Sequence, residues 1–438
     1  MSISTLLTTT SASPQTWAVP NNVPVGTLLN VESWGAGSGG SGSSTSFRAG
    51  GAGGAYATAA SDYFVTPDNA ANGIPFTLNT GSAGTAAANS TAGTDTSFGS
   101  NVNLLTNSRQ KGAVAGTPGT LPTRWSVTTN SSAGNGLSLA TCGLAQTVVG
   151  FGLVPSGTGA GIPYIDINIS GTTNTNTAIG VIFQVESQTA TALPNVAYTT
   201  SGYASLSSTT NIGTTTLFFD STASGSFLAF HASGNLAFTT SLVRYSFAFT
   251  PTEATMNTAL VGIQVNLSSS TAYNFTIRIA GMQFEQAGAA TAWKATPGGY
   301  VLAKGGGATS GTTGGVGGLA SACLPTAGAF NGGSGATRIQ GGGGGGAAGK
   351  NGAGGSSTTG TGATGDNALG GAAGVSNVEG GGGATASAAP TTAGAPGGGG
   401  GANTSTGSGS SGGRGQIRLT IPDLPFWQQA QMLPIMAQ

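Results

Sequence analysis

Apolar and polar residues alternate with a period of two in several stretches between residues 101 and 295. Residues 243–250, Val-Arg-Tyr-Ser-Phe-Ala-Phe-Thr, give the clearest example, in which Arg244 and Thr250 are expected to face water. Successive side chains of a strand point to opposite sides, so this alternation predicts a strand with one buried face. The side chains expected to point inward are Val243, Tyr245, Phe247 and Phe249.

The same pattern recurs in three further stretches, each followed by Ser, Thr, Asn or Gly. No stretch of this region has a convincing period of 3.6, so helices are not expected there. Strands of about 5–8 residues at this spacing predict an antiparallel β-sandwich over residues 101–295. The apolar positions are Ile165, Ile167 and Ile169; Val261, Ile263, Val265 and Leu267; and Tyr273, Phe275, Ile277 and Ile279.

Glycine is distributed unevenly along the chain. Residues 101–295 contain 20 glycines in 195 positions, whereas residues 296–421 contain 45 in 126. Such a tract can be a solvated, flexible linker. Alternatively, polyproline II segments can pack side by side with their backbone N–H groups bonded to neighbours, since only glycine lets backbones approach so closely.

Two features favour the packed interpretation. A linker of about 110 residues would be unusual inside a compact protein. The tract also ends in residues 415–421, Gly-Gln-Ile-Arg-Leu-Thr-Ile, an alternating stretch that predicts a strand able to close the domain. Apolar residues that a solvated spacer has no reason to carry interrupt the glycine runs, namely Leu319, Leu324, Phe330, Ile339 and Leu369.

The order of motifs in the glycine-rich parts resembles a known family. Residues 17–20, 29–37 and 50–56 read Trp-Ala-Val-Pro, Leu-Asn-Val-Glu-Ser-Trp-Gly-Ala-Gly and Gly-Gly-Ala-Gly-Gly-Ala-Tyr. This order resembles the opening of the glycine-rich domain of many tailed-bacteriophage fibre and virion proteins. In that family a Thr-Ser-Phe-Gly stretch, here residues 96–99, leads directly into the equivalent of residues 301–306. The intervening 200 or so residues therefore look like a domain inserted into a loop, which loop tips tolerate well.

The insert has a resemblance of its own. Residues 103–107 and 124–125, together with the closing residues 279–286 and 290–293, are similar to the start and end of jelly-roll modules of the carbohydrate-binding type. Such modules are common in phage tail and head fibres, so the resemblance implies a sugar-binding role by analogy. Packing in the core is the alternative for each candidate glycan contact, namely Trp125, Tyr164, Tyr203 and Trp293.

The expected fold class is all-β: an antiparallel β-sandwich, or jelly roll, inserted into a glycine-rich domain with polyglycine II-like packing and short strands. The expected parts are an N-terminal attachment segment (1–16), the first glycine-rich part (17–100), the sandwich (101–295), the second glycine-rich part (296–421) and a C-terminal tail (422–438).

The tail is expected to dock to another virion protein or a sister chain, because a free tail would expose its apolar side chains. The alternative is that it folds back on its own sandwich. The side chains expected to make these assembly contacts are Phe426, Trp427, Met432, Leu433 and Ile435.

Charge and composition narrow the possible partners. The 12 Lys and Arg residues balance the 12 Asp and Glu residues, so neither nucleic acid nor anionic lipid is an expected partner. The first 20 residues lack Lys, Arg and a continuous apolar core, and no apolar run approaches the ~18 residues of a membrane-spanning helix. Neither a secretory signal nor membrane insertion is therefore expected. Cys142 and Cys323 read as small buried apolar residues rather than as a disulfide framework or a zinc site.

Catalytic constellations are weak in this sequence. A Ser-His-Asp triad would have to use His231, the one histidine, with Asp166 or Asp220, and no Gly-x-Ser-x-Gly motif accompanies it. No calcium-type Asp-rich loop is present, and Lys304 and Lys350 lack the context of a phosphate-binding loop. A glycosidase needs two facing carboxylates, and the insert offers Asp166, Glu186, Asp220, Glu253 and Glu285. We therefore expect no enzymatic activity and no cofactor.

The resemblance implies a bacteriophage structural virion protein, made in the host cytoplasm and assembled into the particle with other virion proteins. The expected role is a tail fibre or fibre-like adhesin that contacts host-surface polysaccharide, and a homotrimer is expected by analogy with fibres. A capsid decoration protein, head fibre or assembly protein without a receptor role is the main alternative. A polysaccharide depolymerase is a third.

Overall fold

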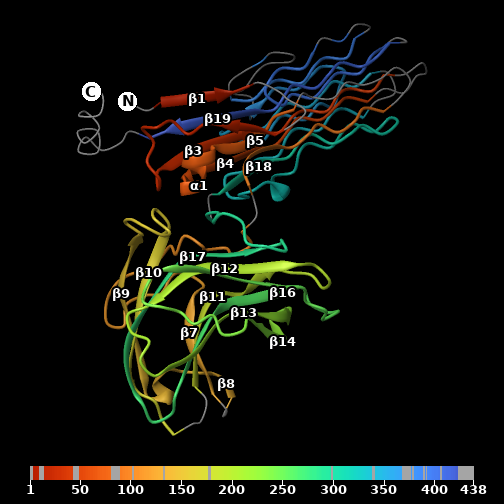
Figure 1. Cartoon of the computed structure of the whole chain (residues 1–438). Helices are drawn as coiled ribbons and strands as arrows, with labels where there is room; N and C mark the ends of the chain where they lie inside the picture. The colour runs from red at the N-terminus through yellow and green to blue at the C-terminus, as the bar shows by residue number, and fades with distance from the viewer. Residues whose placement is uncertain are drawn as a thin grey trace, which may run out of the picture. The chain divides into compact units, whose positions relative to one another are not determined.

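The structure is a computed structural model, and two compact units make up the chain (Figure 1). One unit contains residues 1–65, 72–100 and 300–438, and the other contains residues 66–71 and 101–299. The structure describes residues 3–8, 14–42, 49–79, 89–100, 103–131, 134–175, 179–296, 299–337, 341–366, 376, 379–387, 390, 392–404 and 407–422.

The second unit is built from two antiparallel sheets (Figure 1). The five-stranded sheet has the order β15 (Val243–Phe249), β12 (Tyr198–Leu206), β17 (Ala272–Glu285), β10 (Pro163–Thr172) and β9 (Leu144–Leu153). The six-stranded sheet has the order β14 (Ser226–Ala232), β13 (Ile212–Ala223), β16 (Thr258–Leu267), β11 (Ile179–Thr191), β7 (Ser126–Ser131) and β8 (Gly134–Leu137). The predicted all-β sandwich is confirmed.

The core of this unit contains most of the alternating apolar side chains that the sequence assigned to it. The isoleucines of β10, the odd positions of β16 from Val261 and those of β17 from Tyr273 are at most 6% exposed. The prediction is wrong for Val243, which is 39% exposed. Val243 begins β15, the edge strand of its sheet, and so has no neighbour on one side. The aromatic residues of β15 are half-buried.

The first unit has two four-stranded antiparallel sheets. One has the order β1 (Ile3–Leu7), β19 (Gln416–Ile421), β3 (Leu28–Trp34) and β4 (Tyr56–Phe64). The other has the order β18 (Tyr300–Ala303), β6 (Thr96–Gly99), β5 (Ile74–Thr77) and β2 (Gln15–Trp17). A single 3₁₀ turn of this unit spans Ala320–Ala322, whereas the short helix α1 (Pro67–Asn72) lies almost wholly in the second unit, as does a 3₁₀ turn at Ala140–Cys142.

Strand β19 is the predicted closing strand, and it lies between β1 and β3. Ile3–Leu7, within the segment expected to serve attachment, pair with β19 as β1. Both cysteines are free and buried, as predicted.

Glycine-rich segments from distant parts of the sequence run side by side in the first unit (Figure 1). The amides of residues 343–348 donate in turn to three neighbouring segments. The donor and acceptor pairs are Gly343 to Thr359 (2.8 Å), Gly344 to Ala384 (2.8 Å), Gly345 to Gly51 (2.9 Å), Gly346 to Gly355 (2.9 Å), Ala347 to Gly381 (3.0 Å) and Ala348 to Gly54 (3.0 Å).

Every third amide of this segment returns to the same neighbour. The first and fourth reach residues 355–359, the second and fifth reach residues 381–384, and the third and sixth reach residues 51–54. A period of three is that of a polyproline II helix, whereas a strand has a period of two. The polyglycine II-like packing is confirmed for these residues, and the solvated linker is wrong for them.

Gly50, Gly51, Gly53 and Gly54, from the N-terminal part, follow the same rule. Gly50 and Gly53 donate to residues 333–336, and Gly51 and Gly54 donate to residues 397–400, over distances of 2.7–3.1 Å. The two glycine-rich parts, separated in the sequence by the sandwich, therefore form one hydrogen-bonded lattice.

Close approach explains why glycine is needed. A Cβ atom on Gly345 would lie within 3.0 Å of the Gly333 carbonyl group, and one on Gly50 equally near that of Gly343. The apolar residues within the glycine runs support the packed interpretation only weakly, because Leu319 and Leu324 are 49% and 39% exposed. The remaining interruptions are Phe330, which packs against Trp34, Tyr56 and Ala348, and Ile339 and Leu369, which lie outside the described residues.

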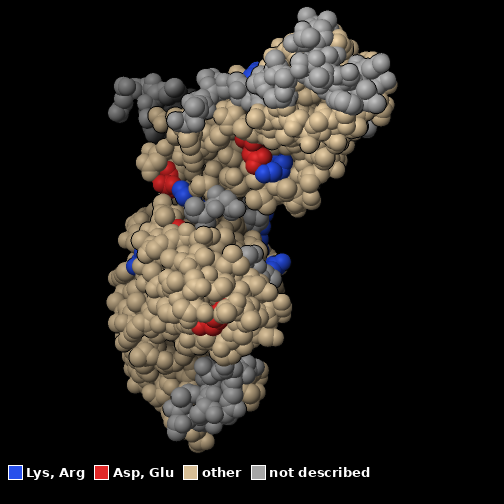
Figure 2. All heavy atoms as spheres, turned by 90° about the vertical axis from the view of Figure 1, so that its right-hand side faces the viewer, with Lys and Arg blue, Asp and Glu red and all other residues tan. Residues whose placement is uncertain are grey.

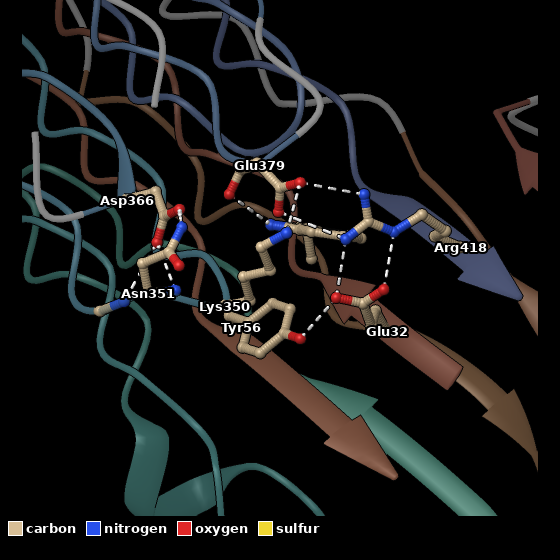
Figure 3. Close-up of polar contacts among 9 residues, drawn as sticks. Glu32, Tyr56, Lys350, Asn351, Asp366, Glu379 and Arg418 are labelled. Carbon is tan, nitrogen blue, oxygen red and sulfur yellow. Dashed lines mark hydrogen bonds and ion pairs between the residues drawn. The ribbon is translucent and has the colours of Figure 1, made fainter. Parts of the chain in front are cut away.

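A charged cluster ties the lattice to the adjacent sheet (Figure 3). Arg418 on β19 donates two hydrogen bonds to Glu32 on β3, at 2.6 and 2.7 Å. It donates two more, at 3.2 and 3.3 Å, to Glu379 of the glycine-rich tract. Lys350 donates to Glu379 at 3.0 Å, and the Tyr56 hydroxyl donates to Glu32 at 2.8 Å.

The ionic state of this cluster follows from its contacts. The hydrogen bonds to Glu32 raise the pKa of Arg418, although burial acts against them. Burial acts to raise the pKa of Glu379, but hydrogen bonds from Arg418 and Lys350 outweigh it and lower the pKa. Arg418 and Glu379 are therefore charged at neutral pH, and they bond to each other within the cluster. We interpret it as structural.

The lattice predicts that Gly345→Ala lowers the stability of the glycine-rich unit by about 3 kcal/mol or more, because the added methyl group meets rigid backbone. Gly360→Ala is the matched control, since its Cβ would meet only the Gly341 carbonyl oxygen at 3.5 Å. Calorimetry of both variants checks the difference. Equal unfolding temperatures for the two variants would contradict the lattice.

Candidate functional site

The structure separates the four aromatic candidates into two groups. Trp125 and Trp293 are 7% and 3% exposed, and Trp125 belongs to the core between the sheets. Neither has an exposed ring face on which a sugar could stack. Tyr164 on β10 and Tyr203 on β12 are half-buried and remain candidates.

Tyr164 and Tyr203 lie in one row across the outer face of the five-stranded sheet. Tyr164 pairs with Ala280 of β17 on one side, and Tyr203 pairs with Ala280 on the other. Neighbouring strands lie ~4.8 Å apart, so the backbones of the two tyrosines, one on each side of β17, are about 10 Å apart across the sheet. The small side chain of Ala280 lies between them.

A polar row runs beside the tyrosines. Arg278 donates to both carboxylate oxygens of Asp166, at 2.8 and 2.7 Å. Its guanidinium carbon lies 4.1 Å from the centroid of the Tyr164 ring. In the following row Asn168 donates to Asn274 at 2.9 Å. The hydrogen bonds to Asp166 raise the pKa of Arg278, so the guanidinium group of Arg278 stays charged.

Two glycines leave the β9 side of this face open. Gly152 pairs with Tyr164, and Gly150 pairs with Asp166. Glycine inside a strand often marks a bulge or a close approach by another backbone or a ligand, and the register between β9 and β10 shifts next to Gly150. The sequence analysis did not single out these glycines, although two glycines within the strand-favouring stretch Val148-Val-Gly-Phe-Gly could have indicated them.

His231 is near a serine and a carboxylate, but the arrangement is not a catalytic triad. His231 Nε2 lies 3.0 Å from Ser221 Oγ and 3.2 Å from Glu253 Oε1. A triad needs the carboxylate on Nδ1, which leaves Nε2 to accept the serine proton. Here the Ser221 hydroxyl donates to Glu253 Oε2 at 2.8 Å, and Ser221 is fully buried.

This cluster joins the two sheets. The His231 ring stacks on Phe249 of β15, with centroids 4.2 Å apart. Burial acts to raise the pKa of Glu253, but hydrogen bonds from its backbone, Ser221 and His231 outweigh it and lower the pKa. The partner of His231 is thus Glu253, not Asp166 or Asp220.

The remaining carboxylates of the sandwich have separate partners. Glu186 accepts hydrogen bonds from the Thr106 amide and hydroxyl, at 2.6 and 2.8 Å. Glu285 accepts from Thr291 and Gln283. None of these contacts joins two carboxylates across a shared opening.

Asp220 differs from the other carboxylates. It lies on β13, and its Oδ1 atom is buried with no hydrogen-bond partner among the described residues. Burial raises the pKa of Asp220 from 3.8 to about 7. A buried, unpaired carboxyl is costly, and such groups concentrate at functional sites.

Other chemistry finds little support in the ranges that the structure covers. No three His, Cys, Asp or Glu side chains there come together as a metal site requires. Lys304 pairs with Asp95 and Lys350 pairs with Glu379, so both lysines are engaged. Among the helices that the structure describes, none has the length and apolar character needed to cross a membrane. The predicted assembly contacts from Phe426 to Ile435 lie outside the described residues.

No protein-family model and no curated protein matches the chain. Among solved structures, the enzymatically active domain of tailspike protein 4 of bacteriophage CBA120 is similar over 38% of this chain and 20% of its own, with 14% identity and a TM-score of 0.24. The chain thus spans about a fifth of that domain.

Carbohydrate-binding modules are also among the similar structures. The xylan-binding domain CBM22-1 of Paenibacillus barcinonensis Xyn10C matches over 44% of this chain and 99% of its own, with 12% identity and a TM-score of 0.24. A promiscuous carbohydrate-binding module of the β-sandwich superfamily matches over 53% and 92%, with 8% identity and a TM-score of 0.27. TM-scores at this level are too low to assign a function.

The raised pKa of Asp220 predicts a pH-dependent stability. The folded state keeps a proton that the unfolded state releases between about pH 4 and pH 7, so the free energy of unfolding falls as pH rises through that range. At 1.36 kcal/mol per pKa unit, the loss is at most about 4 kcal/mol. The variant Asp220→Asn should not show this loss of stability between pH 4 and pH 7.

Urea unfolding at pH 4.5 and pH 8 measures this loss. Glu253→Gln is the control, because its pKa shift has the opposite sign and acts at lower pH. The same loss of stability in wild type and Asp220→Asn would show that Asp220 titrates as an ordinary carboxyl.

Proposed function

We propose that this chain is a bacteriophage structural virion protein, a tail fibre or fibre-like adhesin, whose sandwich contacts host-surface glycan. The observation that carries the proposal is the row of Tyr164, Ala280 and Tyr203 on the outer face of the five-stranded sheet. The virion assignment rests on the motif order of the glycine-rich parts, which resembles that of tailed-phage fibre proteins.

The chemistry of this face suits a polysaccharide. Tyrosine rings offer apolar surface to the C–H faces of a sugar, and their hydroxyl groups remain available to water or ligand. The Asp166–Arg278 fork and the Asn168–Asn274 pair provide donors and acceptors beside the rings. Asp166 neutralises Arg278, whereas Arg244, which pairs with Tyr203 and has its guanidinium carbon 5.8 Å from that ring's centroid, adds a positive charge at the end of the row.

The rest of the molecule fits a role in adhesion. On the face drawn in Figure 2, charged side chains form small separate groups on a mainly neutral surface. Individual contacts of such a surface with glycan are weak, but several copies on one particle multiply them through effective concentration. The hydrogen-bonded glycine lattice would provide a stiff support with few side chains open to chemical damage.

The proposal predicts that Tyr164→Ala and Tyr203→Ala each weaken binding to glycan about tenfold, which corresponds to about 1.4 kcal/mol. The measurement is biolayer interferometry of the full chain on surface polysaccharides purified from a panel of bacterial strains. Phe151→Ala is the matched control, because Phe151 is 51% exposed and points away from Gly150 and Gly152 on the same strand.

Three results would contradict the proposal. If the wild-type protein binds none of the polysaccharides, a decoration or assembly role remains. Electron microscopy of labelled particles would then show whether the protein lies on the head or on the tail. If both tyrosine variants bind polysaccharide as tightly as wild type, the outer face of the five-stranded sheet is not the binding site. Release of reducing ends from any bound polysaccharide would indicate a depolymerase instead.

A further inference from the structure

The outer face of the six-stranded sheet has an apolar cluster that a solvent-facing sheet does not need. Ile182, Phe218 and Leu260 are 8%, 1% and 6% exposed, and they pack together outside the main core. Their sequence neighbours Phe183, Phe219 and Val261 point the other way, into the core between the sheets. Three neighbouring strands, β11, β13 and β16, therefore each place an apolar side chain on both faces.

Exposed phenyl rings border this cluster on the edge strand β14. Phe227 and Phe230 are 56% and 44% exposed. Phe227 pairs with Thr222, and Phe230 pairs with Asp220, so both rings share the outer face of β13. The Phe230 ring lies 5.4 Å from that of Phe218, at an interplanar angle of 31°.

Three oxygen atoms on the same face lack partners. Asp220 Oδ1, Gln264 Oε1 and Thr216 Oγ1 are buried without a hydrogen bond in the part of the chain that the structure describes. Thr216 pairs directly with Gln264, and Asp220 pairs with Leu260. Buried acceptors without donors cost free energy, and a ligand with hydroxyl groups would recover it.

We propose that this face, formed by β13, β14 and β16, is a second saccharide site, separate from the tyrosine row. Phe227 and Phe230 pack against the C–H faces of the sugar, and Asp220, Gln264 and Thr216 accept hydrogen bonds from its hydroxyl groups. Since Phe230 lies opposite Asp220 on an edge strand, rotation of its exposed ring opens the way to Asp220.

The charge of the face selects a neutral ligand. Asp220 and His231 are the only ionisable residues of these three strands, and His231 pairs with Phe219 on the core side. No cationic side chain of these strands is available to hold an anionic sugar. The inference shares the ligand class of the proposed function, but it uses a different sheet and can fail independently.

The test is amide NMR of the deuterated full chain titrated with cellohexaose, xylohexaose, mannohexaose and maltohexaose at millimolar concentration. At least one should give saturable shifts on β13, β14 and β16. Phe230→Ala should raise the Kd about tenfold. Phe151→Ala, which removes a ring of similar exposure from β9 (51% against 44% for Phe230), should leave the Kd unchanged.

Thr216→Val separates a binding role from a structural one. If the hydroxyl only lacks a partner, valine leaves the Kd unchanged and raises the unfolding temperature, which would count against the site. If it contacts ligand, the Kd rises although the protein is at least as stable. Thermal unfolding of each variant confirms that it is folded.

The position of the shifts distinguishes the two proposals. Shifts confined to β10, β12 and β17 would overturn this site and support the tyrosine row. Shifts confined to β13, β14 and β16 would support this site and count against the tyrosine row. Absence of saturable shifts with every oligosaccharide would overturn this site, and a protein ligand for the face would then be the better hypothesis.

Discussion

Backbone hydrogen bonding between glycine-rich segments is the constraint on which the first unit depends. Glycine loses the most conformational freedom on folding and adds no side chain to a core. The compensation is that adjacent backbones approach closely enough for each amide of residues 343–348 to reach a different neighbour in a cycle of three. Gly50, Gly51, Gly53 and Gly54 obey the same cycle, so both glycine-rich parts of the sequence contribute to one lattice.

Side chains are used sparingly in this lattice and more conventionally in the sandwich. The Glu32–Arg418–Glu379 cluster links lattice to sheet, and its charges satisfy one another. The outer faces of the sandwich differ in this respect. Asp166 and Asn168 beside the tyrosine row already have hydrogen-bond partners, whereas three acceptors on the outer face of the six-stranded sheet have none among the described residues. That difference motivates two separate binding proposals.

Period-two alternation was sufficient to predict the buried strands β10, β16 and β17, because each has one face in the core. It failed at Val243, since an alternating edge strand looks the same in sequence as a central one. The pairing of His231 with Glu253 depends on contacts between distant strands. The sequence also could not predict which glycine-rich segments are neighbours in the lattice, because glycine has no side-chain pattern that would specify a partner segment. The doubled apolar positions at Ile182-Phe183 and Phe218-Phe219 were a readable sign of strands apolar on both faces.

Amide hydrogen exchange of residues 50–55 and 343–348 in the intact protein tests the lattice most directly. Each of these amides except that of Ala52, which donates to the Ser38 hydroxyl, donates to a backbone carbonyl of another segment. The account predicts slow exchange there, with protection similar to that of the central strand β16 of the sandwich. Exchange at the rate of an unstructured chain in both segments would contradict it.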